Sequence, residues 1–339
     1  MNDYDQIVRR LGESQKILFV THARPDGDGI GSGSAFTMAA RAAGKEARFL
    51  VPDSVPDIYA FLPPEEPAGP QDFAKLSKWA QLIVVLDTSV SGQLNGLDFS
   101  PSDVKGITVA IDHHSTPGDI ASALWVDSSA GAAGVMVVEI IQTLGWPVDA
   151  KVAQALATAI LSDTGWLRFS NTDARVLQTM AKLVSLGVRP DQIYRKLYQN
   201  DRPNRIRLGG RAMSGLELFC DSRLGVMTLL RRDFEELEAR PDETENLVNE
   251  ALRIRSVEVA VLLVQQDGEI RVSLRSRDDV DVAQVARRFG GGGHAKAAGF
   301  RSNEDIMQVK NLLVKALTEE IAGCKRWHDD DQRISEFHP

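Results

Sequence analysis

Three side chains that can bind a metal ion lie close together near the start of the chain. The stretch from 21 to 33 is THARPDGDGIGSG, and it contains His22, Asp26 and Asp28. It directly follows the apolar run 17–20, which predicts a buried strand, so we expect the three side chains in the loop after that strand. A PDGD sequence by itself is a common turn. A metal site therefore requires matching ligands from elsewhere in the chain.

Further residues of this kind stand where other predicted strands and helices end. They are Asp87, the sequence Asp112-His113-His114, and Asp163. Two adjacent imidazoles and an acid at the end of a buried strand need polar partners, because burying them alone is costly. In an open parallel sheet, the carboxyl ends of the strands share one edge, where ligands bind. We therefore expect these groups to form one site, since separate polar loops would require a series of coincidences.

The expected ligand set contains imidazoles and carboxylates but no cysteine. Its members are His22, Asp26, Asp28, Asp87, His113 and Asp163, with His114 beside them. Such a set suits Mn²⁺, Mg²⁺ or Fe²⁺ better than a closed tetrahedral zinc site. It also exceeds what one ion needs, and two ions roughly 3.5–4 Å apart can share a carboxylate. Asp87 stands alone at its strand end, so it is the expected bridging ligand.

The first half of the chain alternates short apolar runs with helical patterns, which predicts an α/β fold with a parallel, doubly wound sheet. Buried strands are predicted at 16–20, 47–51, 82–87 and 107–112. Helices are predicted at 32–44, 132–145 and 149–163. A further helix, with Asn171 or Thr172 as its N-cap, is predicted to end at Gly187.

A chain of 339 residues with 43% hydrophobic content is long enough for two domains. After Gly187 the sequence becomes rich in Arg, Pro and Asn, which indicates a connection between domains. We predict a first domain at 1–187, a linker at 188–212, a smaller α/β domain at 213–325 and a polar tail at 326–339. In the smaller domain we expect a strand at 225–230, a hairpin turning at Asp267-Gly268, and helices at 280–289 and 303–322.

Composition excludes several classes of protein. No apolar stretch approaches the roughly 20 residues of a membrane span, and the first residues lack the pattern of a signal peptide, so we expect a soluble cytoplasmic protein without membrane partners. A net charge of −8 argues against long nucleic acid as a partner. Cys220 and Cys324 are too few for a disulfide framework, and we assign no role to them or to His328 and His338 in the tail.

Two features of the second half are suited to binding phosphate. Arg275 and Arg277 are two positions apart on a predicted strand, so both point to one face, and guanidinium groups bind phosphate in a bidentate manner. The glycine run that follows lets backbone N–H groups approach an anion closely, as in a phosphate-binding nest. We therefore predict substrate contacts from Arg275, Arg277, Gly291, Gly292, Gly293, His294 and Lys296.

These motifs together resemble a known family. His22-Ala-Arg-Pro-Asp-Gly-Asp28, Leu86-Asp87, Asp112-His113-His114 and Ser162-Asp163-Thr-Gly165 resemble the four motifs of the DHH phosphoesterase superfamily. Ser273 to Arg277 and Gly290 to His294 resemble its companion, the DHH-associated C-terminal domain. The resemblance spans nearly the whole chain, with the motifs in order. Its length and its Gly-Gly-Gly-His sequence are similar to the small stand-alone members of the nanoRNase and 3′-phosphoadenosine 5′-phosphate (pAp) phosphatase type.

The resemblance implies a role for each ligand position. His22, Asp26 and Asp87 would hold one ion, and Asp28, Asp87, His113 and Asp163 would hold the other. Asp112 would orient its neighbours, and His114 would face the substrate phosphate, where it protonates or stabilises the leaving oxygen. Mn²⁺ is the metal that family members favour, and small members are often homodimers.

The implied activity is a metal-dependent phosphohydrolase in which a hydroxide activated by two ions attacks phosphorus. We expect the substrate to lie in a cleft between the domains, which favours pAp, 5′-phosphorylated dinucleotides or RNA a few nucleotides long. A cyclic or linear dinucleotide phosphodiesterase of the same superfamily is the alternative that the motifs leave open. Long-strand exonucleases of the RecJ kind and family II pyrophosphatases fit less well. An inactive nucleotide-binding sensor is the alternative from another class.

Overall fold

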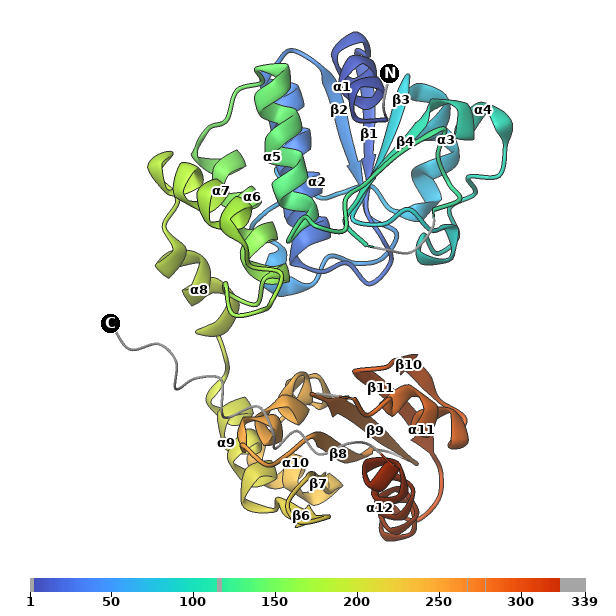
Figure 1. Ribbon diagram of the computed structural model, residues 1–339, viewed down its shortest axis with the longest axis vertical. Helices are drawn as coiled ribbons and strands as arrows, with labels where there is room; N and C mark the ends of the chain where they lie inside the picture. Colours follow the sequence, from blue (N-terminus) through green and yellow to red (C-terminus); the bar gives the residue numbers. More distant parts are fainter. Residues whose placement is uncertain (1–2, 115–117, 267, 278, 324–339) are drawn as a thin grey trace. The chain divides into compact units, whose positions relative to one another are not determined.

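The computed structural model describes residues 3–114, 118–266, 268–277 and 279–323 (Figure 1). Asp267, Cys324 and the tail at 326–339, about which the sequence made predictions, lie outside the described residues. The chain divides into two compact units, with the division between Asn200 and Asp201. The finer limits proposed for the linker, 188 and 212, stay predictions.

The first unit is built on a five-stranded parallel sheet with the order β2-β1-β3-β4-β5. Its strands are β1 (Lys16–Val20), β2 (Glu46–Leu50), β3 (Leu82–Leu86), β4 (Thr108–Asp112) and β5 (Ala123–Val126). The predicted parallel sheet is confirmed, and each predicted strand lies within one residue of an observed one. No prediction covered β5, a four-residue strand at the sheet edge that is too short to show a periodic pattern.

Helices cover both faces of this sheet, which explains why its central strands are continuous apolar runs. The core on one face contains buried side chains of α1 (Asp3–Glu13), α2 (Gly27–Ala42), α5 (Ala133–Leu144), α6 (Ala150–Asp163), α7 (Ala174–Ser185) and α8 (Pro190–Tyr198). The other face packs against α3 (Phe73–Trp79) and α4 (Ser102–Ile107). Figure 1 shows α2 and α5 on one side of the strands and α3 and α4 on the other. The doubly wound arrangement is thereby confirmed.

Helix α2 begins at Gly27, five residues before the predicted start at 32. Asp26 is its N-cap and accepts hydrogen bonds from the N–H groups of Asp28 and Gly29, at 3.0 and 3.1 Å. Asp28 therefore lies in the first helical turn and not in a loop, which corrects the prediction. The glycines that obscured this helix are needed for close packing, because a Cβ at Gly27 would overlap Ser162.

Helix α7 corrects another prediction, because neither Asn171 nor Thr172 is its N-cap. The cap is Asp173, whose side chain accepts a hydrogen bond from the N–H of Val176 at 2.9 Å. Asn171 instead contacts the predicted metal ligand Asp163, as described below. The predicted end of the helix agrees with the structure, since Gly187 has a left-handed φ of 95°.

The second unit is built on a six-stranded mixed sheet with the order β10-β11-β9-β8-β7-β6. Its strands are β6 (Glu217–Phe219), β7 (Leu224–Leu229), β8 (Val259–Gln266), β9 (Glu269–Ser276), β10 (Gly292–His294) and β11 (Ala297–Ser302). Strands β7 and β8 pair in parallel and the other neighbours pair antiparallel. The predicted second α/β unit is confirmed, as is the hairpin, which β8 and β9 form.

The two faces of the second sheet are covered differently. Helices α11 (Val282–Arg288) and α12 (Ile306–Gly323) pack on one face over β7, β8, β9 and β11. Helix α9 (Pro203–Ser214) and the 3₁₀ helix η5 (Leu247–Arg253) pack on the other face over β7 and β8, with α10 (Arg231–Leu237) beside them. Strands β9, β11 and β10 contribute no side chain to this second core. Their side of that face therefore holds polar and small residues.

The glycine run after α11 forms a strand where the sequence suggested only an anion-binding nest. Gly292 to His294 pair with β11, in the register Gly292↔Gly299 and His294↔Ala297. The run requires glycine at 293, because its φ is 139° and a Cβ there would overlap Ala297. Among the residues that the structure describes, no helix has the length and apolar character needed to cross a membrane.

Candidate metal centre

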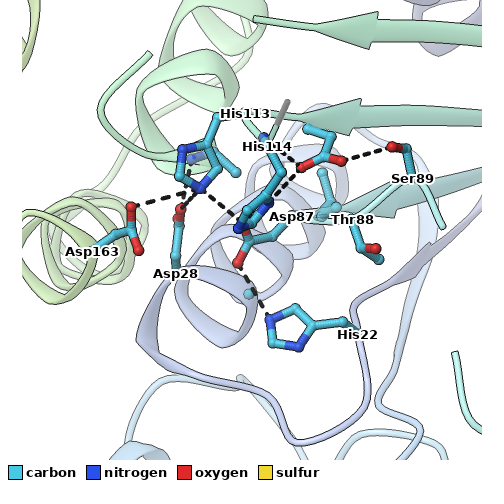
Figure 2. A network of polar contacts seen from close by, with 12 residues as sticks. His22, Asp28, Asp87, Thr88, Ser89, His113, His114 and Asp163 are labelled. Atoms are coloured by element: carbon cyan, nitrogen blue, oxygen red, sulfur yellow. Dashed lines mark hydrogen bonds and ion pairs between the residues drawn. The ribbon is translucent and has the colours of Figure 1, made fainter. Parts of the chain in front are cut away.

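The predicted metal ligands of the first unit come together at the carboxyl edge of its sheet (Figure 2). Strands β1, β3 and β4 are neighbours, and they lead directly to His22, Asp87 and His113. Asp28 comes from the first turn of α2, and Asp163 is the last residue of α6. The parallel topology explains the convergence, because it places all of these strand ends at one edge.

Asp87 lies at the middle of the centre, and only 2% of its side chain is exposed. Its Oδ2 is 3.4 Å from His22 Nε2, and its Oδ1 is 3.3 Å from His113 Nε2. The two carboxylate oxygens thus face different histidines, as Figure 2 shows. The backbone at Asp87 has a φ of 63°, a left-handed conformation that is uncommon for a residue other than glycine and that is found most often at functional sites.

Three overlapping groups could each hold a metal ion, because their ligand atoms lie within 4.8 Å of one another. They are His22 with Asp26 and Asp87, Asp28 with His113 and Asp163, and Asp87 with His113 and His114. The first two groups lie on opposite sides of Asp87. All six predicted ligands are therefore brought together at one place in the first unit.

Asp28 is fully buried and is held by the N-terminus of α5. Its Oδ2 accepts the N–H of Ala133 at 2.6 Å, and its Oδ1 accepts the N–H of Gly134 at 2.9 Å. The Ser32 hydroxyl donates to the same carboxylate at 3.0 Å. Burial and the neighbouring carboxylate of Asp87 raise the pKa of Asp28 well above its usual range. No sequence pattern indicated the support from α5, which depends on how two helices pack.

Asp163 is positioned by Asn171, whose amide donates to the Asp163 backbone carbonyl at 3.2 Å and to its Oδ2 at 3.4 Å. The same amide also donates to the carbonyl of Gly131, at 2.9 Å. Burial and nearby carboxylates raise the pKa of Asp163 to about 6. Sequence reasoning missed this role of Asn171, because its position before a helix suggested a cap.

Asp112 and His114 form a pair beside the metal centre. Asp112 is 1% exposed, and its Oδ1 lies 2.8 Å from His114 Nδ1 and accepts the backbone N–H of His114 at 3.1 Å. The Ser89 hydroxyl donates to the other oxygen at 2.7 Å. The hydrogen bond that the His114 ring donates to Asp112 raises the pKa of His114, whose side chain is half exposed. This arrangement agrees with the expectation that Asp112 orients its neighbour, and Ser89 is a supporting residue that the sequence did not indicate.

The histidines between the carboxylates are strongly basic. Burial lowers the pKa of His22, but the contacts with Asp26 and Asp87 outweigh it and raise the pKa to about 11. For His113, burial is likewise outweighed, by Asp87 above all, and the pKa rises to about 10. The two imidazoles are thus protonated at neutral pH in the absence of a metal.

The donor set fits divalent metal ions on the evidence of its unpaired atoms. Asp87 Oδ1 and His113 Nε2 are buried and lie 3.3 Å apart, but neither makes a hydrogen bond of good geometry. Burying such atoms without partners is costly unless another group satisfies them. Imidazole nitrogens and carboxylate oxygens without thiolates are the ligands that Mn²⁺, Mg²⁺ and Fe²⁺ accept.

The predicted phosphate-binding residues lie in the second unit. Arg275 is on β9, opposite Ala297, and is half-buried; its guanidinium donates to the Leu274 carbonyl at 3.0 Å and has no carboxylate partner among the described residues. Burial lowers the pKa of Arg275. Arg277 follows the end of β9, and its guanidinium contacts the carbonyls of Leu252 and Arg255.

The register of the second sheet places several of these residues on one face. Arg275 pairs with Ala297, and residues paired in this way share a face. Ala297 also pairs with His294 in the backbone register, and a Cβ at Gly292, two residues before His294, would meet only open space. Gly291 and Lys296 flank β10. This face is the part of the sheet that α9 and η5 leave uncovered.

Comparisons with known proteins agree with both halves of this description. Residues 16–160 match the DHH family, N-terminal domain, and residues 224–323 match the DHHA1 domain. The bifunctional oligoribonuclease and PAP phosphatase NrnA of Thermus thermophilus is 32% identical over 306 residues, 90% of this chain and 90% of that protein. This chain belongs to the DHH family. As a DHH protein with its metal-binding groups in place, it is a metal-dependent phosphoesterase.

Other DHH relatives give the same result. The protein of the same name from Bacillus subtilis is 26% identical over 298 residues, which cover 87% of this chain and 91% of that protein. Among solved structures, an exopolyphosphatase-related protein from Bacteroides fragilis has a TM-score of 0.84 and 25% identity, with 94% of this chain and 96% of that chain covered. The exonuclease RecJ bound to manganese shares the fold, at a TM-score of 0.55 and 13% identity over 94% of this chain and 95% of that one.

Proposed function

We propose that this DHH phosphoesterase hydrolyses short phosphorylated nucleotides, namely RNA a few nucleotides long and pAp, with two Mn²⁺ ions or a similar divalent pair. The observation that carries this proposal is the placement of Asp87, whose two oxygens face His22 and His113 on opposite sides. The names of the Thermus and Bacillus relatives, which cover most of this chain, support the substrate class.

The residues of the first unit have distinct tasks in this proposal. His22, Asp26 and Asp87 would hold one ion, and Asp28, Asp87, His113 and Asp163 would hold the other. When bound, such ions neutralise phosphate charge and lower the pKa of a bound water to about 7 in favourable sites. The rigid support of Asp28 by α5 and of Asp163 by Asn171 keeps the carboxylates in place. A carboxylate cluster that repels anions when empty has little use in a sensor, which favours an enzyme.

His114 is suited to hold a proton for the leaving group. Its imidazole is half exposed next to the metal ligands, and Asp112 fixes one ring nitrogen, so the other nitrogen is free to face a substrate. The hydrogen bond to Asp112 raises the pKa of His114, which favours the protonated ring. A leaving alkoxide on phosphorus needs a proton, and a nearby imidazolium can donate it.

The second unit supplies a surface for the rest of the substrate. Arg275 has a guanidinium without a carboxylate partner, and the open space at Gly292 lets an anion approach the backbone of β10. We propose that Arg275, Lys296 and the stretch from Gly291 to His294 contact a second phosphate of the substrate. Arg277 would act mainly by holding the end of η5, because its guanidinium is engaged by backbone carbonyls.

The experiment that tests the proposal is a measurement of product release with Mn²⁺ from a panel of substrates. The panel contains pAp, pApA, RNA of two to five nucleotides, RNA of about twenty, cyclic di-AMP and pyrophosphate. Asp87→Ala serves as the metal-deficient variant, and Asp98→Ala, which changes an exposed aspartate far from the ligands in sequence, serves as the matched control. Metal content is measured for all three proteins.

Turnover of pAp and the shortest RNAs, lost in Asp87→Ala and kept in Asp98→Ala, is the expected result. If cyclic di-AMP is hydrolysed in preference to the other substrates, the proposed chemistry stands, but the chain is the alternative enzyme, a cyclic dinucleotide phosphodiesterase. Metal-dependent nucleotide binding without any product would show that the chain is a sensor and would refute the proposal.

A further inference from the structure

An aromatic cluster lies a few residues beyond the metal ligand Asp163, and the metal centre makes no use of it. The cluster consists of Trp166, in the turn after α6, and of Tyr194 and Tyr198, one helical turn apart on α8. The ring centroids of Trp166 and Tyr194 are 5.0 Å apart, those of Trp166 and Tyr198 5.7 Å, and those of the two tyrosines 5.2 Å. The three rings therefore contact one another.

Nearly half of the surface of each tyrosine is exposed. Tyr194 is 43% exposed and Tyr198 48% exposed, although their helix also carries the buried residues Ile193 and Leu197. Exposed large aromatic side chains that adjoin one another are unusual on a protein surface without a binding role. Helix α8 thus buries Ile193 and Leu197 and leaves its two tyrosines half-exposed.

The backbone that carries Trp166 is held in an uncommon conformation. Gly165, Trp166 and Leu167 have φ values of 53°, 61° and 62°, so two residues with side chains lie in the left-handed region. The backbone N–H of Trp166 donates to the Leu161 carbonyl at 2.8 Å, and both tyrosine rings pack against the indole ring in an edge-to-face arrangement. Conformations of this kind persist only where the surroundings enforce them, and they concentrate at binding and catalytic sites.

The turn is tied directly to the metal centre. Asp163 precedes Trp166 by three residues in the same turn. Ser162 packs against Gly27, next to the N-cap Asp26 of α2. The amide of Asn171, at the other end of the connection to α7, donates to Asp163. The position of Trp166 is therefore fixed by the same contacts that fix a metal ligand.

The charge next to the cluster suits a nucleic acid fragment. Arg195 and Lys196 follow Tyr194 on α8 and so start from other faces of the helix than the tyrosines, but their side chains are long, and neither has a carboxylate partner among the described residues. The Lys196 ammonium lies 4.2 Å from the ring centroid of Phe61. Flat aromatic faces flanked by cations are the features with which proteins bind single-stranded RNA, because bases stack on the rings and phosphates pair with the cations.

We infer that the cluster of Trp166, Tyr194 and Tyr198 is a nucleobase-binding subsite, on which a base of a short RNA stacks while its phosphate is hydrolysed. The inference rests on the proposed function, since it requires a nucleotide substrate. It deepens that function by naming the feature that separates nucleotides from other phosphate esters. Stacking accepts any base, so the subsite would give little preference among the four bases.

The test compares pApA with a 5′-phosphorylated dinucleotide analogue that lacks both bases. The truncating variant is Tyr194→Ala with Tyr198→Ala, and the conservative variant is Tyr194→Phe with Tyr198→Phe, which retains the rings. Leu177→Ala, which shortens an exposed apolar side chain on α7, is the matched control. Thermal melting and metal content establish that each variant is folded and loaded.

Loss of one base stack corresponds to a roughly 5- to 150-fold loss of binding. We expect the truncating variant to lose about tenfold or more in kcat/KM on pApA, mainly through KM, with no change on the base-free analogue. The Phe variant and Leu177→Ala should keep the preference of the wild type. As a readout independent of activity, a dinucleotide containing 5-iodouridine should photo-crosslink to the cluster in the presence of EDTA.

The outcomes separate this inference from the proposed function. If the wild type prefers pApA over the analogue and the truncating variant keeps that preference, only the subsite is refuted. Equal losses of kcat/KM on pApA and on the base-free analogue would show that the rings support the metal centre, and this result would also refute the subsite. If the wild type hydrolyses neither dinucleotide, the proposed function fails, and the subsite fails with it.

Discussion

The pair of Asp112 and His114 allows a quantitative prediction. Asp112→Asn keeps the shape of the buried side chain but removes the charge that lies 2.8 Å from His114 Nδ1. A hydrogen bond to a charged group contributes about 1.5–3 kcal/mol, and one pKa unit corresponds to about 1.36 kcal/mol. Because 51% of the His114 side chain is exposed, solvent screening places the change at the lower end. We therefore expect the pKa of His114 to fall by about one unit.

The sign of the effect follows from the proton that His114 is proposed to donate. The protonated ring is the active form, so activity is present below the pKa of His114 and is lost as pH rises through it. In Asp112→Asn this loss should begin about one unit lower. The variant should then be about tenfold slower than the wild type above both pKa values and nearly equal below them.

The assay is a profile of kcat against pH with saturating pApA and Mn²⁺. Ser89→Ala is the matched control, because it removes a neutral hydrogen bond to the same carboxylate at 2.7 Å and leaves the charge in place. If the alkaline limb of the kcat profile lies at the same pH in Asp112→Asn as in the wild type, and the variant has normal metal content, the role of His114 as the proton donor is contradicted.

Three further predictions concern metal binding. The pKa values of His22 and His113 are raised to about 11 and 10, so a metal ion that binds at neutral pH must displace their protons, and metal affinity should rise with pH. Calorimetry in buffers of different ionisation enthalpy should detect the released protons. Metal binding without proton release would contradict the protonated state of the two histidines. Gly29→Ala places a Cβ against Thr21 and the ring of His22, so its metal affinity should fall, whereas Gly106→Ala, where nothing lies near, should bind metal normally in the same titration. Mn²⁺ at a hundredfold excess over its Kd should add about 2.7 kcal/mol to the free energy of unfolding of the first unit, as measured by denaturant titration, and EDTA should abolish this gain. Equal free energies of unfolding with and without Mn²⁺ would show that the ions do not bind in the first unit.

Local sequence patterns predicted most of the fold because the first sheet is covered on both faces. Strands such as β1 and β3 are then continuous apolar runs, which stand out from the polar segments around them. Patterns failed where packing overrides propensity. The glycines at the start of α2 disfavour a helix locally, yet they are needed because Ser162, Thr21 and His22 press against that turn.

The second unit shows the same limit. The glycine run before His294 has the composition of a flexible loop, but pairing with β11 makes it an edge strand. Arg275 and Arg277 follow the alternation of a strand, although Arg277 lies beyond its end and binds backbone carbonyls. Partners distant in the sequence decide both outcomes.

The sequence by itself determined the chemistry of this protein, because the types of ligand and their positions at strand ends follow from short motifs. It named the six side chains that the structure brings together as candidate metal ligands, since the carboxyl ends of parallel strands must share an edge. Only the tertiary structure decided how these groups are held: the two faces of Asp87, the N–H groups of α5 on Asp28, and the amide of Asn171 on Asp163. Such contacts join residues as far as 106 positions apart in the sequence. They form only when helices and sheet pack together, so no local pattern in the sequence indicates them.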